Sequence, residues 1–190
     1  LLVNTTQNQY NIGFHDVSDI TELVFHLGVS SELNHNDPSE WGVWHPLAPQ
    51  NPSMHWGWAA GYIFIAIEAM IDKNVDGTFE TVLQNHAVDD SYYSELTIAN
   101  TTIETDTSIT IFIDVNYNKM FENINTSEGG VFHGLFEENQ ALINNIINNN
   151  VFIGTSDLTL DEYLISNIIF PNPFTDVIKI NLSQKSIINL

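Results

Sequence analysis

Histidine and tryptophan are concentrated in one segment of the chain, residues 33 to 68. It reads LNHNDPSEWGVWHPLAPQNPSMHWGWAAGYIFIAIE and contains His35, His45, His55 and Met54, together with all four tryptophans of the chain. Neutral imidazole is the commonest side-chain ligand of transition metals, and a thioether is a soft donor suited to copper(I). The segment therefore predicts a metal site.

Two histidines outside this segment are further candidate ligands. His86 ends an expected strand, and His133 lies in the sequence VFHG at the expected start of a helix, whereas His15 and His26 fall in expected strands. The chain has no cysteine, so imidazole, carboxylate, thioether, carbonyl or water must hold any ion.

The tryptophans of the loop have two compatible interpretations. Trp56 or Trp58 lies close enough to a metal to shield it from water or to be oxidised, or both rings close the end of a β-sandwich through their buried area.

A second candidate metal motif follows the loop. Asp72, Asn74, Asp76 and Gly77 have the spacing of an EF-hand calcium loop, but Leu83 replaces the glutamate that such a loop has at its twelfth position. The motif predicts either a weak Ca²⁺ site or an ordinary hairpin turn.

Charge and missing motifs exclude several classes of function. The chain has 4 lysines and arginines against 24 acidic residues, for a net charge of −20, so we expect it to bind neither nucleic acid nor an anionic membrane surface. No apolar run is long enough to span a bilayer. No GxSxG, P-loop or GxGxxG motif occurs, and we expect a protein that is not an enzyme.

Alternation of apolar and polar residues with a period of two dominates the chain. Strands are expected over residues 12–15, 22–29, 62–67, 79–86, 92–99 and 108–115. The run 62–67 is apolar on both faces, as in a central strand that is covered on both sides. One late α-helix is predicted, with Glu137 and Glu138 in its first turn and an apolar stripe formed by Leu135, Leu142, Ile143, Ile146 and Ile147. The fold class is a mainly β, antiparallel β-sandwich with a long His/Trp-rich loop.

Several short motifs occur in a characteristic order between residues 10 and 150. They are FHLGV at 25–29, LNH with Asp37 two residues further on, HPL at 45–47, MHWGW followed by GY and F at 54–64, and a strand that ends in His86. This order resembles the MbnP-like family of copper-binding proteins, which is found beside methanobactin genes and among secreted Bacteroidetes proteins.

The resemblance implies an all-β, secreted or periplasmic protein that binds Cu⁺ or Cu²⁺. It implies His35 and His86 as the first ligands and His55, beside Met54, as the next. In some family members a di-haem partner enzyme oxidises a tryptophan near the copper to kynurenine. The chain departs from the pattern in two places: the strands that precede the segment matching Tyr10 are missing, so an incomplete sandwich is expected, and residues 86–88 read HAV instead of HLG.

The C-terminal segment carries a second resemblance. Residues 171–181, PNPFTDVIKIN, resemble the opening of the C-terminal sorting domain of the type IX secretion system. We therefore expect an MbnP-like domain at 1–156, a linker at 157–167 and a truncated sorting segment at 168–190. This organisation implies a fragment of a protein that the type IX machinery exports to the cell surface or beyond. An edge hairpin begun by a proline-rich turn is the alternative.

The leading hypothesis is a secreted, non-enzymatic copper-binding β-domain for copper acquisition or handling. The alternative is a cell-surface interaction or carbohydrate-binding module in which exposed tryptophans hold a ligand and a calcium-binding turn lies nearby. A metal-dependent hydrolase is a third hypothesis, but no general base is evident in the sequence.

Overall fold

The computed structural model describes residues 1–3, 7, 9–15, 17, 20–99, 102–104, 108–155 and 175–183, with only the backbone at 102–104, 155 and 175–183. The chain divides into two compact units. One comprises Leu1–Val24, Thr97–Asn118 and Asn150–Leu190, and the other comprises Phe25–Leu96 and Lys119–Asn149. The predicted linker at 157–167 lies outside the described residues, as do 168–174 and 184–190 of the predicted sorting segment.

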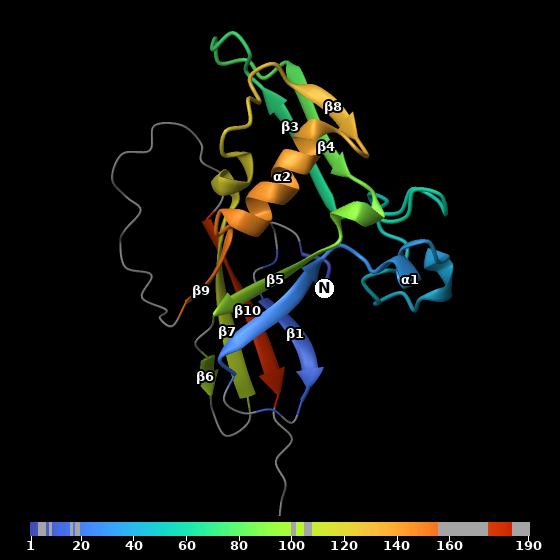
Figure 1. The fold of residues 1–190 in the computed structure, drawn as a ribbon, viewed down its shortest axis with the longest axis vertical. Coiled ribbons are helices and arrows are strands. Elements are labelled where there is room, and N and C mark those ends of the chain that lie inside the picture. Colours follow the sequence, from blue (N-terminus) through green and yellow to red (C-terminus); the bar gives the residue numbers. More distant parts are fainter. Residues whose placement is uncertain are drawn as a thin grey trace, which may run out of the picture. The chain divides into compact units, whose positions relative to one another are not determined.

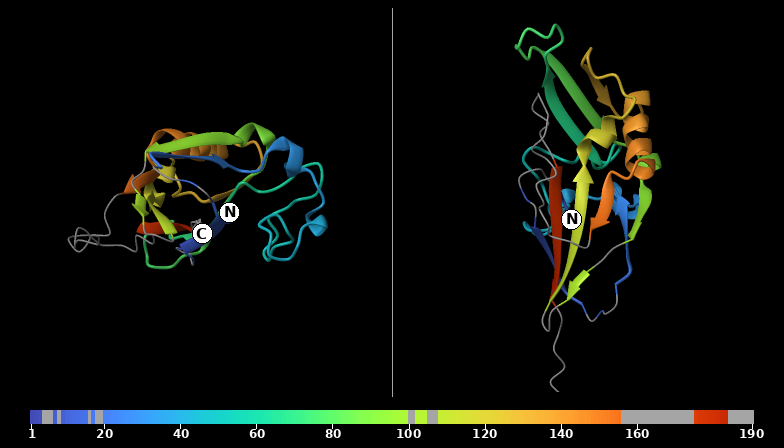
Figure 2. Two further views of the ribbon diagram at one scale, coloured as in Figure 1. Left: turned by 90° about the horizontal axis from the view of Figure 1, so that it is seen from below. Right: turned by 90° about the vertical axis from the view of Figure 1, so that its left-hand side faces the viewer.

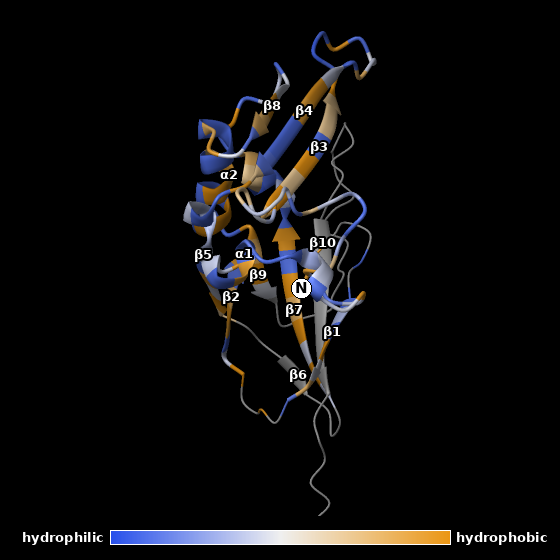
Figure 3. Ribbon diagram, turned by 90° about the vertical axis from the view of Figure 1, so that its right-hand side faces the viewer, coloured by the Kyte–Doolittle hydropathy of each residue, from blue (hydrophilic) through white to orange (hydrophobic). Residues whose placement is uncertain are grey.

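The first unit contains a mixed sheet built around β7 (Ser108–Asn116). One edge of β7 pairs antiparallel with β10 (Thr175–Ser183), which pairs in parallel with β1 (Gln9–Phe14). The other edge pairs antiparallel with β6 (Thr102–Glu104) and β9 (Phe152–Thr155). Most of β7 has the colour of hydrophobic residues in Figure 3, and its buried side chains are Ile109, Ile111, Phe112, Ile113 and Val115.

A separate two-stranded sheet is formed by β2 (Glu22–Leu27) and β5 (Ser94–Ala99).

The second unit contains a three-stranded sheet in the order β3 (Ile65–Ile71), β4 (Thr81–Ala87) and β8 (Gly130–His133). β3 and β4 are antiparallel, whereas β4 and β8 are parallel. The helix α2 (Glu137–Asn148) packs against β4 and β8 (Figures 1 and 2). The opposite face of the sheet exposes Met70, Val82 and Val131, because side chains alternate between the faces of a strand.

A long connection joins β2 to β3 and contains two short helical segments, α1 (Ser31–Asn34) and the 3₁₀ helix η1 (Pro38–Glu40). Its last residues are buried by the connection itself. The Tyr62 amide donates to Asn34 Oδ1 at 2.8 Å, its hydroxyl donates to the Leu47 carbonyl, and the Ile63 amide donates to the Met54 carbonyl. Two further 3₁₀ segments are η2 (Asp90–Tyr92) and η3 (Tyr117–Phe121).

The prediction of a central strand at 62–67 is wrong. β3 begins at Ile65 and forms an edge of the three-stranded sheet, with Glu68, Ala69 and Met70 exposed. The apolar run is buried at Tyr62 and Ile63 because the loop covers it, which periodicity cannot distinguish from cover by a second sheet.

The predicted fold class is confirmed: the protein is mainly β and β-sandwich-like, with one late helix. α2 begins at Glu137 as expected and buries Leu142, Ile143 and Ile146, although Leu135 and Ile147 are exposed. Among the strands that the structure describes, β1 pairs in parallel with β10 and β4 with β8, where an antiparallel arrangement was predicted. Strands β8 and β9 have four residues each and were not predicted.

Candidate metal centre

Three aromatic side chains pack together on the exposed face of the β3–β4–β8 sheet. His86 and His133 are register partners on neighbouring parallel strands, and their rings stack with centroids 4.5 Å apart and planes 6° from parallel. The Trp56 ring meets both edge-on, at 5.1 Å from His86 and 4.8 Å from His133. The fold thus brings together two imidazoles that lie far apart in the sequence.

The two ring nitrogens of His86 have different surroundings. Nε2 lies 3.0 Å from Glu68 Oε1, and the His86 side chain is only 9 % exposed. Nδ1 is buried, and no hydrogen-bond partner for it is found within the described part of the chain. A buried polar atom that lacks a partner costs roughly 1–3 kcal/mol, so Nδ1 of His86 is a candidate position for a ligand.

A buried asparagine fixes the backbone beneath both histidines. Asn139 of α2 is fully buried, and its amide nitrogen lies within hydrogen-bond distance of the carbonyls of His86, Phe132 and Gly134, at 3.1, 2.9 and 2.9 Å. Its side-chain oxygen accepts from Asn85 at 3.1 Å. These contacts tie α2 to the ends of β4 and β8, where the two imidazoles originate.

Trp56 is held by a tight reversal of the chain. The Trp56 amide donates to the Gly61 carbonyl at 2.9 Å, and the Gly61 amide donates to the Gly57 carbonyl at 2.8 Å. Gly61 has φ +77°, and a Cβ there would lie 2.5 Å from the Asn34 amide. Glycine is required at this position by both the backbone angle and the close approach.

Electrostatics favours the neutral form of His133. Burial lowers the pKa of this imidazole, and the nearby His86 lowers it further, while Glu68 acts in the opposite direction. A neutral imidazole has a free lone pair, which is the form that binds metals.

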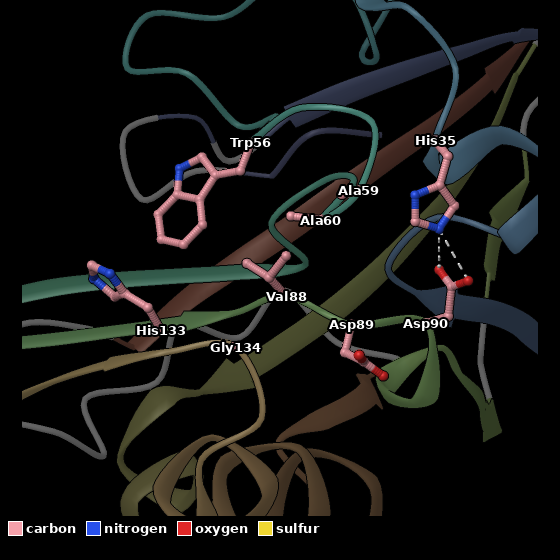
Figure 4. Close-up of a pocket in the computed structure, with 9 residues that line it drawn as sticks. All are labelled: His35, Trp56, Ala59, Ala60, Val88, Asp89, Asp90, His133 and Gly134. Atoms are coloured by element: carbon pink, nitrogen blue, oxygen red, sulfur yellow. Dashed lines mark hydrogen bonds and ion pairs between the residues drawn. The ribbon is translucent and has the colours of Figure 1, made fainter.

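His35 lies in a different environment, although it lines the same cleft as His133 and Trp56. This cleft has a volume of about 370 Å³. Figure 4 shows His35 with Asp90 at one end and His133 with Trp56 at the other, with Val88 and Ala60 between them.

Both ring nitrogens of His35 face oxygen acceptors. Nδ1 lies 2.6 Å from the Trp58 carbonyl, and Nε2 lies 3.1 Å from Asp90 Oδ2. Since carbonyl and carboxylate oxygens only accept, this arrangement suits the doubly protonated ring. The hydrogen bond to Asp90, followed by that to Trp58, raises the pKa of His35. Within the described residues the ring contacts of His86 are with Trp56 and His133, whereas the ring nitrogens of His35 lie at Trp58 and Asp90.

The remaining predicted ligands lie elsewhere in the loop. His55 and Met54 line a second cavity of about 190 Å³, and burial is the main cause of the lowered pKa of His55. The His55 Nδ1 accepts from the Gly57 amide, while its Nε2 is buried and has no partner among the described residues. The His45 ring stacks on Trp41 at 4.1 Å. Trp58 is 71 % exposed, and Trp56 is the tryptophan that contacts the histidine pair.

The predicted calcium motif forms the connection between β3 and β4. Asp72 accepts hydrogen bonds from the amides of Asp76 and Gly77, and Asp76 accepts from the Thr78 amide at 2.8 Å. Ligand atoms of Asp72, Asp76 and Glu80 lie within 4.8 Å of one another, and among the described residues this is the only such group of three.

Comparison with known proteins places the chain in a family. The family model described as MbnP matches residues 1–140, which is most of the chain. The chain belongs to the MbnP family. A search of curated proteins found no match. A search of solved structures also found none.

Two residues that shape the site of this MbnP-family chain were not predicted. Asn139 occupies a position of the apolar stripe of α2, three residues before Leu142, and a polar residue in such a stripe is a usable signal. Glu68 could have been found from the hairpin register, because the turn at Asp72–Asp76 joins the strand of Glu68 to the strand of His86.

No helix among the described residues is both long enough and apolar enough to cross a bilayer.

Proposed function

We propose that this MbnP-family protein binds copper through His86 and His133, beside Trp56, and serves copper acquisition or handling outside the cell without being an enzyme. The observation that carries the proposal is the buried Nδ1 of His86, which has no partner among the described residues, on a ring whose centroid lies 4.5 Å from that of His133. Family membership supports a copper-related role.

The donor set fits copper in three respects. The His86 and His133 rings are stacked neighbours with centroids 4.5 Å apart, so two imidazole donors are present at one place. Imidazole is a ligand for both copper oxidation states. The Trp56 ring packs edge-on against both imidazoles and covers part of the pair. Bound copper would supply a one-electron redox centre.

Titration with Cu⁺ and Cu²⁺ under chelator competition tests this site. We expect His86→Ala and His133→Ala each to abolish the tightest binding event, because two imidazoles act on one ion. His15→Ala is the matched control, since His15 is exposed and belongs to the other unit. Unchanged affinity in both site variants would refute the assignment.

His35→Ala separates this site from the pair expected from the sequence. Because both nitrogens of His35 already face oxygen acceptors, we expect this variant to retain the tight copper site. A loss equal to that of His86→Ala would instead favour a site that includes His35.

We also propose that Trp56 is the tryptophan open to oxidation to kynurenine by a di-haem partner enzyme. Its contact with both imidazoles supports this choice over Trp58, whose side chain is mostly exposed. Peptide mass spectrometry of protein from its native source tests it: kynurenine at Trp58 alone would contradict the assignment.

Export is the last part of the proposal. We infer that the C-terminal segment is a type IX sorting signal and that the protein acts at the cell surface or in the medium of a bacterium of the Bacteroidetes type. The sequence PNPFTDVIKIN supports this inference. Fractionation of cells that express the chain with and without residues 168–190 tests it, and export that is equal in both would contradict it.

A surface interaction or carbohydrate-binding module with bound Ca²⁺ is the second candidate function. The convergence of Asp72, Asp76 and Glu80 within 4.8 Å favours it, as do Trp44 and Trp58, which are 94 % and 71 % exposed. Calorimetric titration of metal-free protein with Ca²⁺ tests the turn. Binding that Asp76→Asn abolishes would support this candidate, and absence of binding in the wild type would remove its calcium component.

A further inference from the structure

We propose that Glu68 is a positioning residue for the copper site: it holds the His86 imidazole in the tautomer whose Nδ1 lone pair is available to the metal. This inference rests on the proposed function. It assigns a role to Glu68, a carboxylate that was not among the candidate ligands predicted from the sequence.

The strand register places Glu68 beside the histidine. His86 pairs with Ala66 across β3 and β4, and Glu68 pairs with Gln84. Glu68 is therefore the diagonal neighbour of His86 on the same face of the sheet, a separation that a long side chain spans. Its carboxylate meets His86 Nε2 at 3.0 Å.

The surroundings of both ring nitrogens of His86 favour the same tautomer. A carboxylate oxygen only accepts hydrogen bonds, so Nε2 carries the hydrogen that faces Glu68. In a neutral ring, Nδ1 then has the lone pair. The opposite tautomer would direct a lone pair at the carboxylate and leave a buried N–H at Nδ1 without an acceptor among the described residues.

The exposure of the two side chains keeps the desolvation penalty of this pairing small. The His86 side chain is 9 % exposed and the Glu68 side chain is 60 % exposed. Glu68 keeps most of its hydration while it accepts one hydrogen bond from the nearly buried ring, so no charge is fully desolvated. A carboxylate that binds the second nitrogen of a ligating histidine is a recurrent support of metal sites, because it orients the ring and raises its basicity.

Nuclear magnetic resonance of the metal-free, ¹⁵N-labelled protein tests the tautomer without copper. Two-bond correlations of the His86 ring, assigned by their loss in His86→Ala, are expected to show the proton on Nε2 in the wild type. Glu68→Ala is expected to yield a mixture of tautomers. Glu40→Ala is the matched control, because it removes one exposed carboxylate outside the sheet, and it is expected to leave the His86 signals unchanged.

Copper measurements on the same variants test the consequence. Glu68→Ala is expected to weaken copper affinity about 10- to 100-fold and to raise the reduction potential, since a nearby negative charge favours Cu²⁺ over Cu⁺. Glu68→Gln keeps an acceptor but removes the charge, so it is expected to retain the Nε2–H tautomer and to lose less affinity. It also separates positioning from charge if Glu68→Ala folds poorly.

The outcomes distinguish the inference from the function on which it rests. A proton on Nδ1 in the wild type, or a Glu68→Ala variant with unchanged tautomer and unchanged copper affinity, would overturn the role of Glu68 while leaving the copper site intact. Copper binding that survives His86→Ala would overturn the proposed site itself. A shifted tautomer with weakened copper binding in Glu68→Ala, alongside an unaffected Glu40→Ala, would support the proposal.

Discussion

Replacing Asn139 with alanine is expected to destabilise the second unit strongly. The side chain is fully buried, and its amide contacts three carbonyls while its oxygen accepts from Asn85. Alanine removes these bonds and leaves the buried Asn85 amide without its acceptor. A net hydrogen bond contributes about 1 kcal/mol and a buried unpaired group costs roughly 1–3 kcal/mol, so the expected loss is about 3 kcal/mol.

Tryptophan fluorescence during urea unfolding is the suitable assay, because all four tryptophans lie in the second unit. Asn144→Ala is the control: Asn144 is exposed on the same helix, and its side chain accepts a hydrogen bond from Gln140, so a change within about 0.5 kcal/mol is expected. An Asn139→Ala variant that unfolds within about 1 kcal/mol of the wild type would show that the buried amide does not secure α2 to the sheet. Copper affinity should fall along with stability, because the same bonds hold the backbone of His86.

Three further predictions concern the loop. The pKa of His35 is raised above 6.5 by its hydrogen bonds to Asp90 and Trp58, and the pKa of Asp90 is lowered below 3.8 by Asn34 and His35. The pairing of His35 with Asp90 should therefore stabilise the metal-free protein most between pH 3.8 and pH 6.5. This stabilisation should be lost as the pH rises through the folded pKa of His35 and as it falls through that of Asp90. Urea midpoints should decline as the pH rises above 6.5 and as it falls below 3.8, and an equal pH profile in Asp90→Asn would count against this pairing. Gly61→Ala should lower the free energy of unfolding by roughly 1–3 kcal/mol in the fluorescence assay, because alanine at φ +77° is strained and its Cβ would approach the Asn34 amide. An unchanged free energy of unfolding would mean that the turn rearranges freely. Copper should quench fluorescence mainly through Trp56, so that Trp56→Phe loses most of the quenching; the same loss in Trp58→Phe alone would place the metal elsewhere.

Local patterns predicted most of the secondary structure. The alternation in β7 and the apolar stripe of α2 were sufficient because each reflects burial of one face of a single element. The run at 62–67 failed because a loop, instead of a second sheet, covers Tyr62 and Ile63. β8 was assigned to the start of a helix, since four residues are too few to display a period.

The sequence by itself determined the inventory of possible ligands. It excluded cysteine chemistry, and it identified His86, His133 and Trp56 among a larger set of candidates. It also indicated the MbnP-like family, which the family model confirms. These conclusions depend on residue types and short motifs, which are properties of the chain alone.

Only the tertiary structure decided which of these residues meet. The parallel pairing of β4 with β8 aligns His86 with His133, and the β3–β4 register brings Glu68 to His86, whereas His35 is engaged by Asp90 and Trp58. Strand order and register arise from many weak, non-local contacts summed over the fold, and a shift of one residue would turn each of these side chains to the opposite face. The pairing of distant donors therefore could not be read from local pattern.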